Sequence, residues 1–379
     1  MKILILNAAE RSHPTQSIIR AGEKKGHTMI VHDPANFSPL VSNVESGFDR
    51  MYQLMAKGNT RFNIRDIDIV IPRIAGNLLY NSFIVEHFTE NLGIPSIQSA
   101  AGLRAASNKF HTIQICSRYG IKTPITVYAK TSNDIDFLIE KVKGIPFIIK
   151  YNSGSQGAGV MLVESRKTAI SALEGLLKNK ADIILQQFIE SKGQDIRAVV
   201  VGDKVVVAYR RTAPKGDFRS NLSLGGSGEL VQLSMDDQII CVKASKAIGL
   251  EVSGVDLIKD LKGVTYLNEI NSNFGFAGEK ITGVSFGEHI INYIETRKNS
   301  GILNQPKAPD YYEQLRMQYN TLSQQLKYFT NNERLLQLFE STKGQEIHYK
   351  DYNGRPCLRK ITSIHSLYKI VFDTFLIRQ

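Results

Sequence analysis

The sequence KYNSGSQGAGV runs from Lys150 to Val160, between the apolar runs IPFII (145–149) and VMLV (160–163). This pattern predicts two strands joined by a glycine-rich loop. Its three glycines leave backbone N–H groups open to close approach, because no Cβ stands in the way. The lysine at the end of the first strand would add a point charge for phosphate oxygens. The stretch is therefore either a loop that closes over polyphosphate or an ordinary mobile hairpin loop.

Two better-known phosphate motifs do not match this stretch. A P-loop requires Gly-Lys-Ser/Thr running into a helix, whereas this loop runs into a strand. A dinucleotide fingerprint also requires a helix after its glycines. Other parts of the chain must therefore decide whether the loop binds phosphate.

Composition indicates a globular protein of two or three domains: 379 residues, of which 42% are hydrophobic and 22% charged. No apolar run approaches the ~20 residues of a membrane span, and the opening MKILILNAAE predicts a strand followed by polar residues, without a signal peptide. The three cysteines lie far apart and fit neither a metal site nor a disulfide framework. We therefore expect a cytoplasmic protein with no membrane partner.

The formal net charge of +11 is compatible with an acidic partner such as nucleic acid, a ribosome or an acidic peptide. More often such an excess reflects solubility together with a nucleotide site. We expect no direct nucleic-acid substrate.

Residues 1–95 alternate between strand and helix patterns. KILIL, TMIVHD and IDIVIPRI are strand-like, a short helix is predicted over 15–25, and SFIVEHFTENLG has helical spacing of apolar residues. The alternation predicts a small doubly wound α/β domain. Because no glycine fingerprint follows the first strand, this domain is expected to form one wall of a cleft.

Residues 96–300 place further motifs around the glycine-rich loop. A helix is predicted over 102–119, and it contains Lys109, although a lone helical lysine is usually only solvated surface. After the strand-like DIILQQFI, the sequence DIRAVVVGDKVVVAYRR predicts a hairpin with a Gly-Asp turn. The polar loop TAPKGDFRSNLSLGGSGE follows, so basic side chains cluster here: Arg210, Arg211, Lys215 and Arg219.

A second hairpin, VSGVDLIKD followed by VTYLNEIN, carries the acidic residues. Glu269 and Asn271 are two apart on a strand, so their side chains share a face, and Asp256 could lie beside them on the partner strand. Two carboxylates and an amide oxygen suit Mg²⁺ shared with nucleotide phosphates. The alternative is an acidic strand facing solvent, but the neighbouring residues are apolar and a buried unpaired acid is costly. The pattern favours a metal site.

Residues 301–379 have a different character. NQPKAPD (304–310) is typical of a linker, polar helices are predicted over about 310–339, and Asn353-Gly354 marks a hairpin turn. No catalytic constellation is visible in this tail. We expect a packing, oligomerising or substrate-docking role.

Taken together, these motifs resemble the ATP-grasp superfamily, and within it the RimK-like glutamate ligases. The resemblance covers about residues 95–295, and the first domain loosely, through these stretches: KYNSGSQGAGV, LQQFIES, GQDIRAVVVGDKVVVAYRR, KGDFRSNLSLGG, VSGVDLI and LNEIN. It implies an α/β (α+β) ATP-grasp fold. An N-terminal doubly wound domain (1–95) would precede two α+β subdomains that clasp ATP (96–165 with the glycine-rich loop, 166–300 with the metal site), and a C-terminal extension (301–379) would follow.

The resemblance also implies the cofactors and the roles of single residues. ATP would bind with Mg²⁺, as two ions, with Mn²⁺ as an alternative. Lys109 and Lys150 would contact phosphates from opposite sides, under a lid that includes Ser153, Gly154, Ser155, Gln156 and Gly157. The hinge residues Gln187 and Phe188 would read adenine, and Asp195 would reach the ribose. The phosphate or acyl-phosphate ligands would be Arg197, Arg211, Arg219 and Asn221, and the metal ligands Asp256, Glu269 and Asn271.

The reaction implied is ATP-dependent joining of a carboxylate to an amine through an acyl phosphate, with glutamate or another amino acid and a peptide, protein or small-molecule acceptor. A dimer or tetramer would be typical. Two departures leave specificity open: the hinge has Gln187 where an acid is common, and Ser272–Phe276 replaces small residues and a Pro-Gly. The alternatives are a ligase that tailors a gene-encoded peptide and a non-catalytic ATP sensor.

Overall fold

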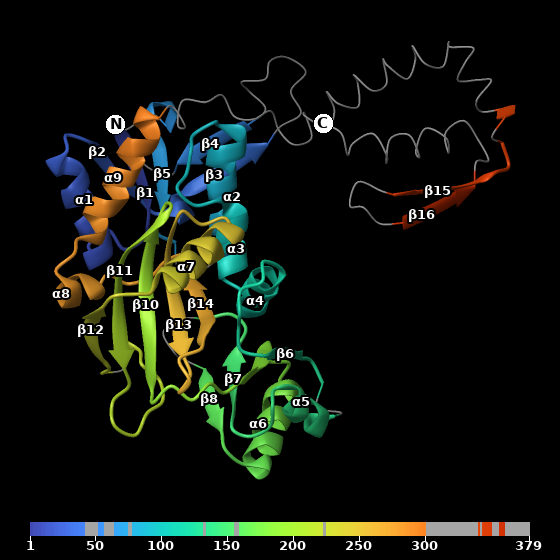
Figure 1. Cartoon of the computed structure of the whole chain (residues 1–379). Helices are drawn as coiled ribbons and strands as arrows, with labels where there is room; N and C mark the ends of the chain where they lie inside the picture. The colour runs from blue at the N-terminus through green and yellow to red at the C-terminus, as the bar shows by residue number, and fades with distance from the viewer. Residues whose placement is uncertain are drawn as a thin grey trace. The chain divides into compact units, whose positions relative to one another are not determined.

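The computed structural model describes residues 1–41, 52–56, 64–74, 78–131, 134–154, 159–222, 225–300, 340–341, 343–350 and 356–360 (Figure 1). The chain divides into two units, residues 1–305 and residues 306–379, and each is described by itself.

The first unit begins with a parallel sheet of order β2-β1-β5, built from β1 (Lys2–Leu6), β2 (Thr28–His32) and β5 (Ile69–Pro72). Ile3 and Ile5 face the core shared with α1 (His13–Lys24) and α9 (Phe286–Asn299), whereas Leu4 and Leu6 face the core shared with α2 (Leu78–Glu86). Helices therefore cover both faces, as expected of apolar parallel strands. This confirms the predicted doubly wound arrangement.

Shorter elements surround this sheet. They are the 3₁₀ turns Pro34–Asn36 and Ile64–Asp66, the antiparallel pair β3 (Phe37–Val41) and β4 (Tyr52–Ala56), and a π-helical turn at His87–Asn91 that continues α2. The β3–β4 pair was not expected from the sequence.

The helix predicted over 102–119 is wrong, because the structure has two helices, α3 (Ala100–Ala106) and α4 (Lys109–Arg118). Asn108 has extended backbone angles (φ −117°, ψ 108°), and its side chain accepts a 2.8 Å hydrogen bond from the His111 N–H. Asparagine favours such an N-cap over a helix interior. Lys109 is consequently the first residue of α4.

The glycine-rich stretch lies in a four-stranded antiparallel sheet of order β6-β9-β7-β8. Its strands are β6 (Thr126–Ala129), β7 (Phe147–Tyr151), β8 (Val160–Val163) and β9 (Ile183–Gln187). The core under it includes residues of α5 (Ile135–Lys141) and α6 (Arg166–Lys178). The predicted hairpin is confirmed, with Lys150 opposite Val160. The predicted lid residues Ser155, Gln156 and Gly157 lie outside the described residues.

A five-stranded antiparallel sheet of order β12-β11-β10-β13-β14 follows. Its strands are β10 (Gln194–Val201), β11 (Lys204–Thr212), β12 (Ser227–Val231), β13 (Val252–Lys259) and β14 (Thr265–Asn271). Ile196, Ala198 and Val200 face a core that includes residues of α7 (Met235–Ala247). The alternate residues of β10, beginning with Asp195 and Arg197, therefore face the other way.

After this sheet, α8 (Gly278–Thr282) and α9 bring the chain back to the N-terminal sheet, where α9 lies beside α1 (Figure 1). The domain boundaries at 95, 165 and 300 remain predictions. The four-stranded sheet itself extends to Gln187, since β9 pairs with β6 and β7.

In the second unit, β15 (Glu346–Lys350) pairs antiparallel with β16 (Pro356–Lys360), which confirms the predicted hairpin. Its Asn353-Gly354 turn and the helices predicted over 310–339 lie outside the described residues. In the described part of the chain, no helix has both the length and the apolar content to cross a membrane.

Candidate functional site

Strand register brings the predicted charged residues together on one face of the five-stranded sheet. Asp195 lies opposite Arg211, Arg197 opposite Asp256, and Asp256 opposite Glu269. Cross-strand partners share a face and can interact directly. Residues as far apart in sequence as Arg197 and Asp256, which are 59 positions apart, thus become neighbours.

Asp256 is the centre of a buried ion network. It is 3% exposed, it accepts both N–H groups of an Arg197 fork, and it lies 3.0 Å from Arg211 Nη2. Arg211 in turn donates two hydrogen bonds to Asp195, at 2.7 and 2.6 Å. Burial alone would raise the pKa of Asp256, but the two guanidiniums hold it below its usual range. The Asp195 carboxylate, predicted to reach the ribose, is here the partner of Arg211.

The three predicted metal ligands share this face. Glu269 lies 3.6 Å from Lys109 Nζ, and Asn271 Nδ2 lies 3.3 Å from Asp256 Oδ2. Although Asp256 already accepts from two arginines, each carboxylate oxygen has two lone pairs, and Asn271 could offer its amide oxygen after rotation. The donor chemistry therefore fits a hard divalent cation such as Mg²⁺. No larger cluster of His, Cys, Asp or Glu with metal-binding potential occurs among the described residues.

The two predicted phosphate lysines approach this face from the four-stranded sheet and α4. Lys109 Nζ donates to the Gly154 carbonyl at 2.7 Å, and Lys150 Nζ donates to Asn268 Oδ1 at 2.9 Å. Asn268 is a site residue that the sequence analysis missed. The strand register shifts between Asp256 and Leu257, so Asn268 has no direct partner on β13, and a pattern of alternate residues cannot show such a bulge.

A cavity between the two sheets is lined by most of the predicted residues. They are Lys109, Lys150, Gly154, Gln187, Phe188, Asp195, Arg211, Arg219, Asn221, Asp256 and Glu269. Apolar walls come from both sheets, through Ile148 and Ile258. Arg197 and Asn271 are not in this lining, although both contact Asp256, and Ser153 is exposed outside it.

Two residues of the lining have local partners that their predicted roles did not include. Arg219 forms a fork with Asp217, whose hydrogen bonds from Arg219 lower the Asp217 pKa to about 2. Gln187 accepts a 3.3 Å hydrogen bond from the Ile125 N–H through its side chain. The neutral side chain of Gln187 at the predicted hinge thus binds the backbone immediately before β6.

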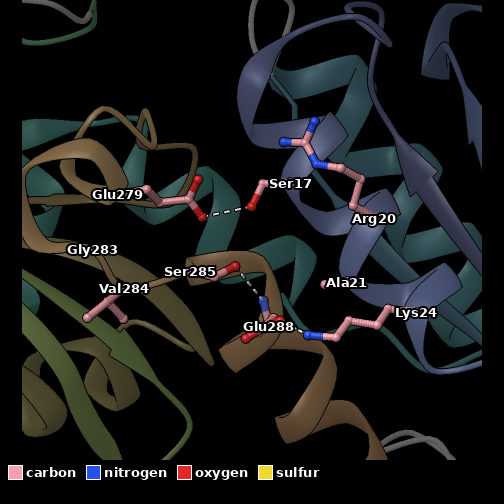
Figure 2. A pocket seen from close by; sticks show the side chains of 9 residues that line it. All are labelled: Ser17, Arg20, Ala21, Lys24, Glu279, Gly283, Val284, Ser285 and Glu288. Atoms are coloured by element: carbon pink, nitrogen blue, oxygen red, sulfur yellow. Dashed lines mark hydrogen bonds and ion pairs between the residues drawn. The ribbon is translucent and has the colours of Figure 1, made fainter.

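A second pocket lies away from these residues, where α1 faces α8 and α9 (Figure 2). Its polar groups mostly bind each other: Ser17 donates to Glu279 at 2.7 Å, and Lys24 pairs with Glu288 at 2.8 Å. Glu279 also accepts from the Phe286 N–H at 2.7 Å. These contacts join α1 to α8 and α9, so the pocket is explained by packing.

Asn152 holds the two lysine-bearing elements in place, a role the sequence analysis did not identify. It is 1% exposed, its carbonyl accepts the Lys109 N–H at 2.9 Å, and its Oδ1 accepts the Phe110 N–H at 2.9 Å. Its Nδ2 donates to Asp182 at 3.1 Å. The backbone and the side chain of Asn152 bind the first two N–H groups of α4, whose N-cap is Asn108. Asn152 thereby fixes the position of Lys109 relative to Lys150, which lies two residues before it.

We expect Asn152→Ala to raise the KM for ATP by roughly 10-fold, because the part-buried Phe110 N–H and the Asp182 carboxylate each lose a hydrogen bond worth about 1 kcal/mol and α4 can shift. Steady-state kinetics and thermal unfolding measure the two effects. Asn179→Ala is the matched control, since the Asn179 amide is exposed and bonds only Gly175 within α6. A lower melting temperature together with an unchanged KM for ATP would show that Asn152 has a purely structural role.

Comparisons with known proteins show the family of the chain and its fold. The model of the RimK-like ATP-grasp domain matches residues 106–294, and that of the RimK PreATP-grasp domain matches residues 1–103. A Shewanella oneidensis protein named probable alpha-L-glutamate ligase 1 is 38% identical over 297 residues, which cover 78% of this chain and 95% of its own.

Two solved structures share the fold. The ATP-grasp ligase PsnB, complexed with a phosphomimetic variant of its minimal precursor, Mg and ADP, gives a TM-score of 0.59 at 18% identity, over 79% of this chain and 99% of its own. The macrocyclase MdnC from Microcystis aeruginosa, bound with precursor peptide MdnA, gives 0.57 at 14% identity, over 78% and 100%.

The fold, with a cavity clasped between two antiparallel sheets, is that of an ATP-grasp protein. The chain belongs to the RimK-like ATP-grasp family of carboxylate–amine ligases. The fold class predicted from the sequence is thereby confirmed.

Proposed function

We propose that this protein binds ATP between its two antiparallel sheets and joins the carboxylate of one substrate to the amine of another. The observation that carries the proposal is the meeting of two lysines and a glycine-rich hairpin, from one side, with a buried arginine–aspartate network from the other. A cavity lined by both sets suits a triphosphate whose negative charge needs cations on two sides.

In the first step, the substrate carboxylate attacks the γ-phosphoryl group, giving an acyl phosphate and ADP. Lys109 and Lys150 position the phosphates, and Gly154 begins the hairpin loop that would close over them and exclude water. Asp256, Glu269 and Asn271 would hold the divalent ions, two Mg²⁺ or Mn²⁺. When bound, these ions offset charge on the phosphate oxygens.

In the second step, the amine attacks the acyl carbon, an amide forms and phosphate leaves. Arg211 faces the cavity, and its contacts with Asp195 and Asp256 fix the direction of its guanidinium. A preorganised donor of this kind stabilises the charge that develops on the leaving phosphate and on the tetrahedral intermediate. Arg219 and Asn221, from the loop after β11, would contribute further donors.

We propose glutamate as the amino-acid substrate. The support comes from relatives named probable alpha-L-glutamate ligases, which align with this chain over 95% and 99% of their own length. For the acceptor, we propose a peptide, because PsnB and MdnC share the fold and were each solved with a precursor peptide. The homo-oligomer and the docking role of the tail remain predictions of the same proposal.

The test is ADP release with Mg-ATP and a panel of amino acids and peptides, followed by mass spectrometry of the products. A ligase shows acceptor-stimulated ADP release and a product heavier than the acceptor by one amino acid less one water. ADP release that no acceptor stimulates, with no amide product, would favour the ATP-sensor alternative.

The Lys150 ammonium predicts a pH dependence of ATP binding. Burial and the nearby Lys109 charge lower its pKa to about 8, more than Glu269, Asp256 and Asp195 raise it. Above pH 8 the free protein progressively loses this positive charge, so we expect the Kd for ATP to rise by up to about tenfold per pH unit. Titration calorimetry between pH 7 and pH 9.5 measures the slope.

Lys150→Arg is the control, because a guanidinium stays charged over this range and should flatten the slope. An unchanged slope in that variant would assign the titration to another group. The stability effect has the opposite sign: the pKa of Lys150 in the folded protein lies below the ordinary lysine value of 10.5, so the unfolded chain binds more protons from about pH 8 to 10.5. The Lys150 contribution to stability therefore rises with pH across that window and is lost below it.

A further inference from the structure

Arg73 is a buried cation at the edge of the N-terminal sheet. It follows β5 directly, its N–H donates to the Leu6 carbonyl at 2.9 Å, and its side chain is 5% exposed. It therefore lies at the carboxyl ends of parallel strands, which is where open α/β sheets bind their ligands.

Unlike the other buried arginines of the described structure, Arg73 has no carboxylate partner. Arg197 and Arg211 each form a fork with an aspartate. Arg73 Nη2 donates only to the Phe274 carbonyl, at 2.7 Å, and its buried Nε has no hydrogen-bond partner. Desolvation without a compensating anion lowers the Arg73 pKa to about 10. An unpaired buried guanidinium is costly, and its donors are left for an anion.

The surroundings of Arg73 connect it to the proposed catalytic face. Its guanidinium stacks on the rings of Phe274 and Phe276, at 5.7 and 4.9 Å from their centroids. A Cβ placed on Gly254 would lie 2.9 Å from Phe274 and 3.0 Å from Arg197 Cδ, so the ring packs directly on β13.

Gly254 is also the strand partner of Asn271. One aromatic ring therefore separates Arg73 from the strands that carry the proposed metal ligands. Both rings belong to the segment Ser272–Phe276, which directly follows β14.

We propose that Arg73 binds a carboxylate of the amino-acid substrate that is not activated, and that Phe274 and Phe276 orient the guanidinium toward it. The inference rests on the proposed ligase function with glutamate as a substrate, and it assigns the residue that recognises one carboxylate of that substrate. The substrate would neutralise a charge that the free protein buries at a cost. A guanidinium offers five N–H donors in a planar fork, which suits two-point binding of a carboxylate.

The first experiment measures thermal unfolding of the wild type, Arg73→Met and Arg73→Lys, each with and without millimolar glutamate. Without ligand, we expect Arg73→Met to melt at the wild-type temperature or above it, because methionine removes an unpaired buried charge. Glutamate should raise the melting temperature of the wild type. The increase should be smaller for Arg73→Lys and absent for Arg73→Met. Arg104→Met is the control, since Arg104 is partly exposed and paired with Glu86.

The second experiment measures kinetics. We expect Arg73→Met to raise the KM for glutamate roughly 30-fold or more, as for other buried charge partners, with the KM for ATP within about twofold. Glutamine and isoglutamine, each of which lacks one carboxylate, identify the group that Arg73 recognises.

A lower melting temperature of Arg73→Met without ligand, together with an unchanged KM for glutamate, would show that Arg73 only supports the Phe274 segment. If Arg73→Met does not fold, the same comparison is made with Arg73→Lys, for which a wild-type KM would overturn the proposal. Failure of the ligase function is distinguishable: the wild type would then form no amide with any acceptor, while the glutamate-dependent melting shift, which needs no turnover, would still decide the role of Arg73.

Discussion

Glu269→Gln is expected to reduce amide formation by about 10³-fold or more, equivalent to about 4 kcal/mol of transition-state stabilisation. The substitution keeps the shape of the side chain but removes the charge that a divalent cation requires. Glu269 is the carboxylate of the proposed metal set with fewest partners, since its only described ion pair is the 3.6 Å contact with Lys109. Its side chain is 29% exposed, so the fold should tolerate the change.

Single-turnover amide formation with saturating Mg-ATP measures this effect, and thermal unfolding checks the fold. Glu229→Gln is the matched control: Glu229 lies in the same sheet, on β12, but its exposed ion pair with Arg210 contributes little. Ligation by Glu269→Gln at the wild-type rate would remove Glu269 from the metal set.

Arg211→Ala should lower kcat by about 10² to 10³-fold, as expected for one preorganised electrostatic donor, while the Kd for ATP changes by less than tenfold. The same substitution should reduce the free energy of unfolding by roughly 3–5 kcal/mol, because Asp195 loses its fork and Asp256 loses one of two cations. Pre-steady-state kinetics, nucleotide binding and denaturant unfolding measure the three quantities.

Two further variants separate catalysis from stability. Asp195→Asn combined with Arg211→Ala also removes the carboxylate that loses its partner in the single variant. The free energy of unfolding should therefore largely return to the wild-type value, while kcat stays low. Arg210→Ala is the positional control, since Arg210 is the neighbour of Arg211 on β11 and its side chain pairs with Glu229 at the surface. A wild-type kcat in Arg211→Ala would exclude a role in the chemical step.

Local patterns in the sequence were sufficient for most strands of the first unit. KILIL, TMIVHD and the stretches around the Gly202-Asp203 turn alternate or run apolar with clear turn residues, and all are strands in the structure. The helix over 102–119 failed because a capping asparagine at Asn108 outweighed the apolar spacing on either side. Caps depend on the hydrogen bonds of a few atoms, which an average over a long window does not register.

The sequence by itself predicted a phosphate loop at Lys150 and a metal site at Asp256, Glu269 and Asn271, because a lysine beside a glycine-rich loop and oxygen donors on alternate strand positions are local patterns. The ligase roles of these residues, and any role for Lys109, came from the family resemblance and remain predictions. Which of these residues form ion pairs or hydrogen bonds with one another was decided only by the tertiary structure. Register across β10, β11 and β13 joins Asp195 to Arg211 and Arg197 to Asp256. Asn152 binds the Phe110 N–H of a helix 42 positions away, and Arg73 contacts Phe274 across 201 positions without an anionic partner. Whether a buried charge is neutralised depends on groups brought together by folding, and this is a property of the packed molecule.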